Sequence, residues 1–284
     1  MKRLSLIKSQ LCSNNHCGAN CNKYETLVES DSKLSKSIKI ITLNQPQNLN
    51  ALTDRMIGEI SCVLSRYNYD PSVKVVIITG TGKSFVSGAN IKGFETQTHQ
   101  SRIKGGDYYL ERLTSLYYSF KKPLLAAVNG FCFGGGLELA LNCDMIFASE
   151  KAILGFPEIK LGLFPGAGGT QKLVKIMGYL KASEYILTGK NIPLQEAREK
   201  GLLNEIFKHD ELLSKVEEQA FTISKMGMIS LLSAKQSMQN SLETGLQHGL
   251  KVEKYLFDPL FNTQDKNVGV SAFVGKKKPE FTDN

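Results

Sequence analysis

The sequence lacks any hydrophobic run long enough to cross a membrane. Its longest apolar stretches, Val75 to Ile78 and Pro123 to Val128, are far shorter than the roughly 20 residues that a membrane helix needs. A chain of 284 residues with 42% hydrophobic and 22% charged residues is neither disordered nor a coiled coil by composition. We therefore expect a soluble protein with one large domain, or one domain and an appendage, and no membrane partner.

The sequence also lacks the motifs of several common enzyme classes. It has no G-x-S-x-G nucleophile motif, and its four histidines lie in polar segments or near the N-terminus. Both facts disfavour hydrolysis by a catalytic triad and catalysis by a histidine-bound metal. Neither the G-x-G-x-x-G fingerprint nor the P-loop motif is present, which disfavours a dinucleotide or nucleoside triphosphate as ligand.

Cysteine is scarce, and its spacing indicates neither a metal site nor disulfides. Three of the six cysteines lie near the N-terminus beside His16, but their spacings do not form the paired C-x2-C pattern of structural zinc sites. The other three stand far apart in apolar segments, as is typical of reduced intracellular cysteine. We expect no metal, and no cofactor separate from the substrate.

Acidic residues are missing from the first 24 positions, which carry Lys2, Arg3, Lys8 and Lys23 among serines and have no continuous apolar core. This composition is typical of a mitochondrial transit peptide, and the alternative is a disordered N-terminus of a cytoplasmic protein. Without these four charges the net charge falls from +8 to +4. So weak a basic balance suits an anionic small ligand as well as a polynucleotide.

Hydrophobic patterns predict an α/β core. Nearly all-apolar strands are expected at 38–43, 73–79, 123–128 and 144–148, and strands of this kind need cover on both faces. Asn50 is expected to cap the helix that ends at Asp70-Pro71. After about residue 170 helical patterns replace the strands. We predict a leader over 1–24, a catalytic domain over 25–210 and a helical region over 211–284.

Two glycine-rich turns, Gly80 to Asn90 and Asn129 to Glu138, lead from strands into helices. Such turns expose backbone N–H groups that can bind phosphate, or can each supply one N–H to an oxyanion. Close backbone packing is the alternative. Glu138 and Glu158 both lie in apolar stretches, where a carboxylate is costly to bury without a purpose or a partner. If they lie close together, one can hold a proton while the other accepts one.

Five segments together resemble the crotonase, or enoyl-CoA hydratase/isomerase, superfamily, and short-chain enoyl-CoA hydratase most of all. They are Leu43-Asn-Gln-Pro-Gln-Asn-Leu-Asn-Ala-Leu52, Ser87-Gly-Ala-Asn-Ile-Lys92, Ala127 to Ala140, Phe156 to Thr170 and Ala272 to Lys278. The resemblance runs from about residue 38 to 281. It implies a right-handed spiral of repeated ββα units, followed by C-terminal helices that build trimers, usually paired into hexamers.

The resemblance also implies a reaction and the residues that perform it. The reaction is syn addition of water to a 2-enoyl-CoA, giving a 3-hydroxyacyl-CoA, in β-oxidation of fatty acids or of branched-chain amino acids. Glu138 would act mainly as base and Glu158 as proton donor, while the N–H groups of Ala89 and Gly135 form the oxyanion hole. The residues expected to contact the acyl-CoA are Asn90, Ile91, Lys92, Gly166, Phe273 and Lys276, the last two often from a neighbouring subunit.

Several alternatives stay open at this point. Within the superfamily, the chain could isomerise 3-enoyl-CoA or hydrate methylglutaconyl-CoA. From a different class comes RNA binding, for which basic residues of the segment 100–122, such as Arg112 and Lys122, are the support; Asp107 and Glu111 interrupt the run. A trimer without catalytic activity is a third alternative, and the presence of Glu138 and Glu158 argues against it.

Overall fold

The computed structural model describes residues 24–91, 94–101 and 108–283. The predicted leader up to residue 23 and the predicted CoA contact Lys92 therefore lie outside the described residues. Within them, a six-stranded sheet has the order β1 (Leu27–Asp31), β2 (Ile38–Leu43), β3 (Val75–Gly80), β5 (Leu124–Val128), β7 (Met145–Ser149) and β10 (Glu205–Phe207). Only β1 pairs antiparallel with its neighbour, so the fold is a mixed α/β structure with a largely parallel sheet.

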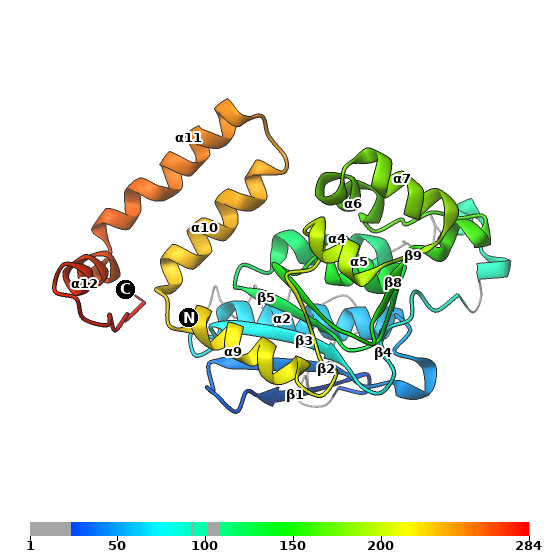
Figure 1. Cartoon of the computed structure of the whole chain (residues 1–284), viewed down its shortest axis with the longest axis horizontal. Helices are drawn as coiled ribbons and strands as arrows, with labels where there is room; N and C mark the ends of the chain where they lie inside the picture. The colour runs from blue at the N-terminus through cyan, green and yellow to red at the C-terminus, as the bar shows by residue number, and fades with distance from the viewer. Residues whose placement is uncertain (1–23, 92–93, 102–107, 284) are drawn as a thin grey trace.

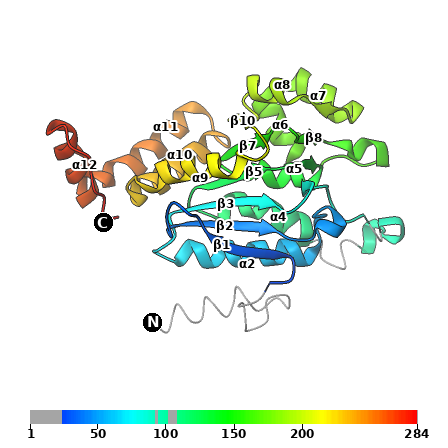
Figure 2. The ribbon, with the colours of Figure 1, turned by 60° about the horizontal axis from the view of Figure 1, so that its bottom comes forward.

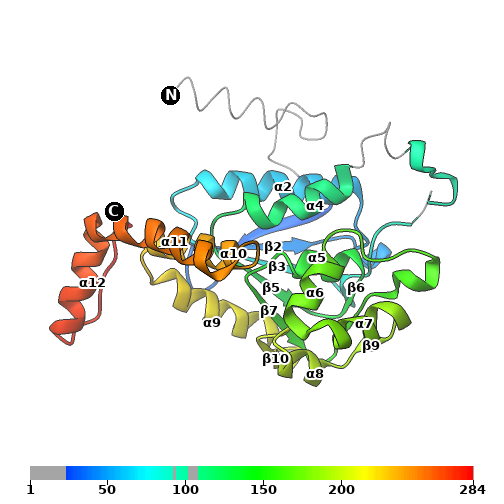
Figure 3. The same ribbon diagram turned by 90° about the horizontal axis from the view of Figure 1, so that it is seen from above.

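Both faces of this sheet are buried, as the apolar strands predicted. Alternate residues point to opposite faces, so Val75 and Ile77 pack with the helix α9 (Leu212–Ser224), whereas Val76 and Ile78 pack on the other side. That other side is covered by α2 (Asp54–Tyr69) and α4 (Tyr108–Ser119). Figure 3 shows α2 and α4 on one side of the strands and α9 on the other. The first helix of the predicted C-terminal region thus covers the sheet.

A second sheet takes two of its four strands, β4 (Ser84–Val86) and β6 (Phe131–Phe133), from the glycine-rich segments that were expected to be turns. It has the order β4, β6, β8 (Ile153–Gly155) and β9 (Asn191–Ile192). Each of β3, β5 and β7 is followed by one of these short strands, so the chain passes from the large sheet to the small one three times. This repeated passage matches the predicted succession of ββα units.

Asn50 does not cap a helix, which corrects the expectation from the sequence. Thr53 is the N-cap of α2 and its hydroxyl accepts a hydrogen bond from the Met56 N–H. Asn50 is fully buried in a left-handed conformation with φ 54°. Its side chain accepts from the Gln45 N–H at 2.8 Å and donates to the carbonyls of Thr81 and Ser84 at 3.0 and 2.8 Å. The residue therefore joins two loops beside the first glycine-rich turn.

Short helices follow the small sheet and carry the site described below. They are α5 (Gly135–Ala140), the 3-10 helix η3 (Pro157–Leu161), α6 (Gly169–Met177), α7 (Tyr179–Thr188) and α8 (Leu194–Glu199). The strands β9 and β10 lie in the part of the chain where helices alone were expected. Both are only two or three residues long, too short for a periodic pattern to reveal.

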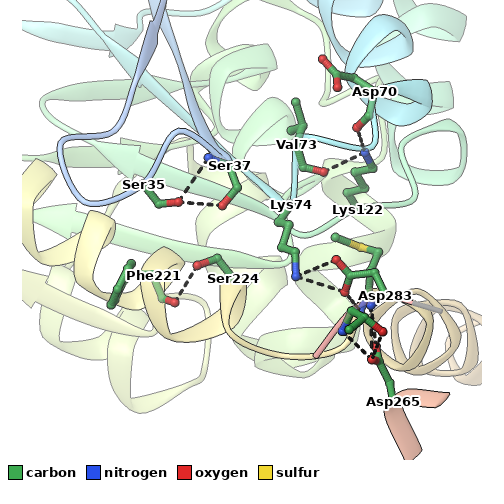
Figure 4. Close-up of polar contacts among 12 residues, drawn as sticks. Ser35, Ser37, Asp70, Val73, Lys74, Lys122, Phe221, Ser224, Asp265 and Asp283 are labelled. Atoms are coloured by element: carbon green, nitrogen blue, oxygen red, sulfur yellow. Dashed lines mark hydrogen bonds and ion pairs between the residues drawn. The ribbon is translucent and has the colours of Figure 1, made fainter. Parts of the chain in front are cut away.

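The last three helices, α10 (Met228–Ser241), α11 (Leu246–Phe257) and α12 (Gln264–Val274), extend away from the body (Figure 1). Lys235 is the buried residue of α10, and its ammonium group bonds to the Asp144 carboxylate at 2.8 Å. The chain end then folds back, and Asp283 binds Lys74 and accepts from the Met228 N–H (Figure 4). Of the helices described, none is both long and apolar enough to cross a membrane.

Candidate active site

Glu138 lies in the middle of α5 and is almost fully buried, with 3% of its surface exposed. Its Oε1 accepts hydrogen bonds from the backbone N–H groups of Ala167 and Gly169, at 2.6 and 2.9 Å. These two donors lie at the start of α6, where the N–H groups of the first turn have no partner within the helix. The N-terminus of one helix therefore holds the carboxylate of another.

The surroundings of Glu138 act on its pKa in opposite directions. Burial raises the pKa, because the charged form loses water, while the two backbone donors and the nearby Lys172 ammonium lower it. Burial prevails, so the pKa lies above the ordinary range of a glutamate. A carboxylate with hydrogen bonds fixed on one oxygen and a raised pKa is suited to accept a proton through the other oxygen.

Glu158 lies in η3, and its surroundings differ from those of Glu138. Its Oε2 is buried and accepts no hydrogen bond from the described residues. Burial, together with the charge of Glu138, raises the pKa of Glu158 to about 7, against the opposing effect of its own backbone N–H. The charge of Glu138 acts on Glu158, so the two carboxylates lie within electrostatic reach of each other. Glu158 can therefore carry a proton near neutral pH.

Gly134 connects the two glutamates. Its carbonyl accepts the Glu138 N–H at 3.0 Å, and a Cβ atom at this position would lie 2.6 Å from Oε1 of Glu158. Its backbone has φ 51° and ψ −123°, a conformation that only glycine adopts without strain. Gly134, the first glycine of the triplet that the sequence singled out, is thus needed for the close approach of Glu158.

The two predicted oxyanion-hole residues lie on neighbouring backbone segments. Gly135 is the first residue of α5, so its N–H has no acceptor within that helix. Ala89 bridges Leu52 in parallel fashion, which directs the Ala89 N–H away from the Leu52 segment. A Cβ at Gly88 would lie 3.6 Å from the Phe133 carbonyl oxygen, so the two turns are in contact.

The predicted acyl-CoA contacts fall into two groups. Asn90 and Ile91 directly follow Ala89 and are exposed, and Gly166 is exposed in the loop before α6. Phe273 and Lys276 lie at the end of α12, and Phe273 is 85% exposed. Figures 1 and 3 place α12 at one end of the molecule, beyond α10 and α11, and α5 within the body. A single chain therefore does not bring Phe273 and Lys276 to the two glutamates.

The sequence analysis did not identify the two backbone donors to Glu138, Ala167 and Gly169. A signal for them was present, because Gly166 to Gly169 is a third glycine-rich turn that enters a helix. The rule that such turns bind anions applies to it as it does to the other two. What the sequence could not show is that the anion held there is a side chain of the same protein.

One basic residue of the segment 100–122, which supported the RNA-binding alternative, is not available for RNA in the structure. Lys122 is 5% exposed, and its ammonium group donates to the carbonyls of Tyr67, Asp70 and Val73 at 2.7, 2.5 and 2.8 Å. Figure 4 shows it directed at Asp70 and Val73. A lysine bound in this way closes the end of α2 and cannot contact a phosphate.

Comparisons with known proteins agree with this geometry. The family model described as enoyl-CoA hydratase/isomerase matches residues 33–284. "Enoyl-CoA hydratase, mitochondrial" of Pongo abelii is 38% identical over 94% of this chain and 90% of its own length. "Probable enoyl-CoA hydratase, mitochondrial" of Dictyostelium discoideum is 38% identical over 90% of this chain and 91% of its own. The crystal structure of an enoyl-CoA hydratase from Bacillus anthracis superposes with a TM-score of 0.85 at 32% identity, covering 92% of this chain and all of that one.

Proposed function

This chain belongs to the enoyl-CoA hydratase/isomerase family, and on that premise we propose that it catalyses the hydration of a 2-enoyl-CoA thioester to a 3-hydroxyacyl-CoA. The observation that carries the proposal is the pair Glu138 and Glu158. Two carboxylates share one buried site, yet one is held by backbone N–H groups and the other has a pKa of about 7. Such a pair can accept one proton and donate another.

The reaction assigns one role to each glutamate. Water bound between them loses a proton to Glu138, and its oxygen forms a bond to the β-carbon of the enoyl thioester. The electron pair of the double bond moves toward the thioester carbonyl, and Glu158 then gives its proton to the α-carbon. Glu138 ends the step protonated and Glu158 ionised, so a proton must return to Glu158 before the next turnover. Delivery of both groups from one side gives syn addition.

The oxyanion hole is the second part of the proposal. As water attacks, negative charge builds on the thioester oxygen, and the N–H groups of Ala89 and Gly135 are the donors that we assign to it. One such donor contributes about 10² to 10³ in rate, because it stabilises charge that develops in the transition state. The first turn of α5 would then supply both a donor, through Gly135, and the base, Glu138.

The acyl-CoA and the assembly follow from the same family resemblance. Asn90, Ile91, Lys92 and Gly166 are proposed to lie along the substrate within one subunit. We propose a homotrimer or homohexamer, in which Phe273 and Lys276 reach the CoA of a neighbour. Its support is the exposed apolar surface of the last helices, where Leu246, Tyr255 and Phe273 are 79, 80 and 85% exposed.

The location and the metabolic role are proposals as well. Some relatives carry the word mitochondrial in their names and others come from bacteria, and both kinds are 38% identical to this chain. Similarity alone therefore does not decide the location of this protein. The acid-free, basic first 24 residues favour the mitochondrial matrix over the cytoplasm. In that compartment the reaction would serve β-oxidation of fatty or branched acyl chains.

The test is loss of the conjugated enoyl-thioester absorbance with crotonyl-CoA and longer 2-enoyl-CoAs. Glu138→Gln and Glu158→Gln are each expected to slow hydration by about 10² to 10⁴, while Glu150→Gln, at an exposed glutamate outside the site, leaves it unchanged. A wild-type protein that leaves every 2-enoyl-CoA intact but converts 3-enoyl-CoA to the conjugated form would be an isomerase, and the hydratase proposal would be wrong.

A further inference from the structure

The helix α5 carries Gly135 and Glu138 but has little stability of its own. It has six residues, two of which are glycine, and its N-cap Gly134 provides no side-chain hydrogen bond. Glycine in a helix costs about 1 kcal/mol relative to alanine, and helices this short do not persist in isolation. Contacts with the rest of the protein must therefore hold α5 in place.

One of these contacts is made by a partly buried lysine at the end of α5. The ammonium group of Lys172 donates to the Leu141 carbonyl at 2.9 Å and to Oδ1 of Asn142 at 2.7 Å. Asn142 in turn donates through Nδ2 to the carbonyls of Glu138 and Leu113, both at 3.0 Å. Lys172 therefore reaches the main chain of Glu138 through a single side chain.

Lys172 comes from α6, the helix whose first N–H groups bind the Glu138 carboxylate. The helices α5 and α6 lie side by side (Figure 2). The contact is reciprocal, because an acid of α5 meets the N-terminal end of α6 while a cation of α6 meets the C-terminal carbonyls of α5. Both pairings have the favourable sign, since negative charge is stabilised at a helix N-terminus and positive charge at a C-terminus.

The electrostatics distinguish Lys172 from a surface lysine. Burial lowers its pKa to about 8, although the groups around it favour the charged form. These groups are Glu138 on α5, Cys143 and Asp144 beyond its end, and Glu243 beyond the end of α10. In return, the Lys172 charge lowers the pKa of Glu138. Partial burial of a lysine costs stability unless its ammonium group is paired and hydrogen-bonded.

We propose that Lys172 is a positioning residue for the reaction: its ammonium group fixes the end of α5, and thereby the placement of Glu138 and of the Gly135 N–H, against the first turn of α6. This inference rests on the proposed function for its kinetic consequence. The structural part, that Lys172 keeps α5 and α6 together, does not depend on which thioester the protein converts.

The test compares Lys172→Met, Lys172→Arg and Lys175→Met. The first removes the charge, the second keeps it, and the third removes an exposed lysine one turn further along α6. With crotonyl-CoA, Lys172→Met is expected to lower kcat about 10- to 100-fold with KM changed less than about threefold, as expected when transition-state stabilisation alone is lost. Lys172→Arg should recover most of kcat, and Lys175→Met should equal the wild type.

Two further readouts separate positioning from mere stability. Without Lys172 the pKa of Glu138 should rise, so the acidic limb of the kcat/KM profile moves to higher pH. Amide hydrogen exchange at residues 167–169 should speed up at least about tenfold, because the N–H groups that hold Glu138 open more often. Should Lys172→Met be insoluble, Lys172→Gln keeps a hydrogen-bond donor without the charge and answers the same question.

A lowered melting temperature with unchanged kcat, an unmoved acidic limb and unchanged exchange at 167–169 would overturn the proposal. The wild-type assay run alongside judges the hydratase proposal separately. If the wild type proves inactive on every 2-enoyl-CoA, faster exchange at 167–169 in Lys172→Met still supports the link between α5 and α6, and unchanged exchange contradicts it.

Discussion

Glu158 approaches Gly134 so closely that a Cβ there would lie 2.6 Å from the Glu158 Oε1. Gly134→Ala is therefore expected to push Glu158 away from the site, besides straining a backbone with φ 51°. We predict a loss of hydratase activity of about 10² or more, as expected when a catalytic proton donor is displaced. The measurement is kcat/KM with crotonyl-CoA, together with a far-ultraviolet spectrum to establish that the protein is folded.

The matched control for this variant is Gly201→Ala. Gly201 also has a positive φ, 79°, but a Cβ there would meet no atom within 4 Å. It should lose stability by about 1 to 2 kcal/mol from backbone strain and keep its activity. Equal losses of activity in both variants would show that strain, rather than contact with Glu158, causes the effect.

The pH dependence of kcat/KM should follow the two glutamates. The proposed mechanism needs Glu138 ionised and Glu158 protonated. Burial raises the pKa of Glu158 to about 7, so activity should fall as the pH rises through about 7 and this group loses its proton. On the acidic side, activity should fall as Glu138 gains a proton. This fall should occur at a pH above the ordinary pKa range of a glutamate, because burial raises the pKa of Glu138 too. A profile without an alkaline limb would contradict the role of Glu158.

Replacing Glu158 should stabilise the folded protein at alkaline pH. The pKa of Glu158 is raised by folding, so its contribution to stability is intact at acidic pH and is lost as the pH rises through about 7. Glutamine resembles the protonated form at every pH. We expect Glu158→Gln to exceed the wild type by about 1 kcal/mol near pH 8, a value reduced for solvent screening, and to match it near pH 4. Urea unfolding at both pH values measures this difference.

The attachment of α10 should depend on the ion pair between Lys235 and Asp144. Lys235 is 6% exposed and bonds to the Asp144 carboxylate and to the Lys122 carbonyl, both at 2.8 Å. Lys235→Met leaves Asp144, whose side chain is 23% exposed, without its cation, which should cost more than the roughly 1 kcal/mol of an exposed pair. The exposed pair of Lys254 and Asp258 is the control, and Lys254→Met should cost less than about 1 kcal/mol.

Urea unfolding measures the stability of both variants. Adding Asp144→Asn to Lys235→Met should restore part of the stability that Lys235→Met loses. Equal small effects at Lys235 and Lys254 would mean that α10 is held by contacts other than the ion pair. Because α10 begins the helices that extend from the body, its loosening should also reduce the size of the proposed trimer or hexamer, measured by light scattering.

The two glutamates that we propose as catalytic could be singled out from the sequence because their signal is local. Glu138 and Glu158 each interrupt an apolar stretch, and the segments around them resemble one family over nearly the whole chain. The strands of the large sheet were predictable for a similar reason, since a run such as Val75 to Gly80 is apolar on both faces. Buried strands of this kind are built from apolar residues, so the residue types alone indicate that the strand is buried.

The parts that could not be predicted depend on contacts between distant segments. The short strands β4 and β6 lie in glycine-rich turns, where neighbouring strands rather than local propensity produce the structure. Asn50 resembles a helix cap in sequence, but its side chain bonds to two loops that are distant in sequence. The bond from Lys172 to Asn142 joins residues 30 positions apart, and neither residue carries a motif.

The Glu138 carboxylate is held by two main-chain N–H groups, and this has an evolutionary consequence. A side-chain donor can be lost by a single substitution, whereas every residue except proline supplies an N–H. Which residues positions 167 and 169 can accept is therefore limited by the room for their side chains. At Gly169, for example, a Cβ would lie 2.8 Å from the Phe156 ring. Selection that alters the basicity of Glu138 must act on its charged and apolar neighbours, so related proteins with different pH optima should differ there and keep the loop before α6.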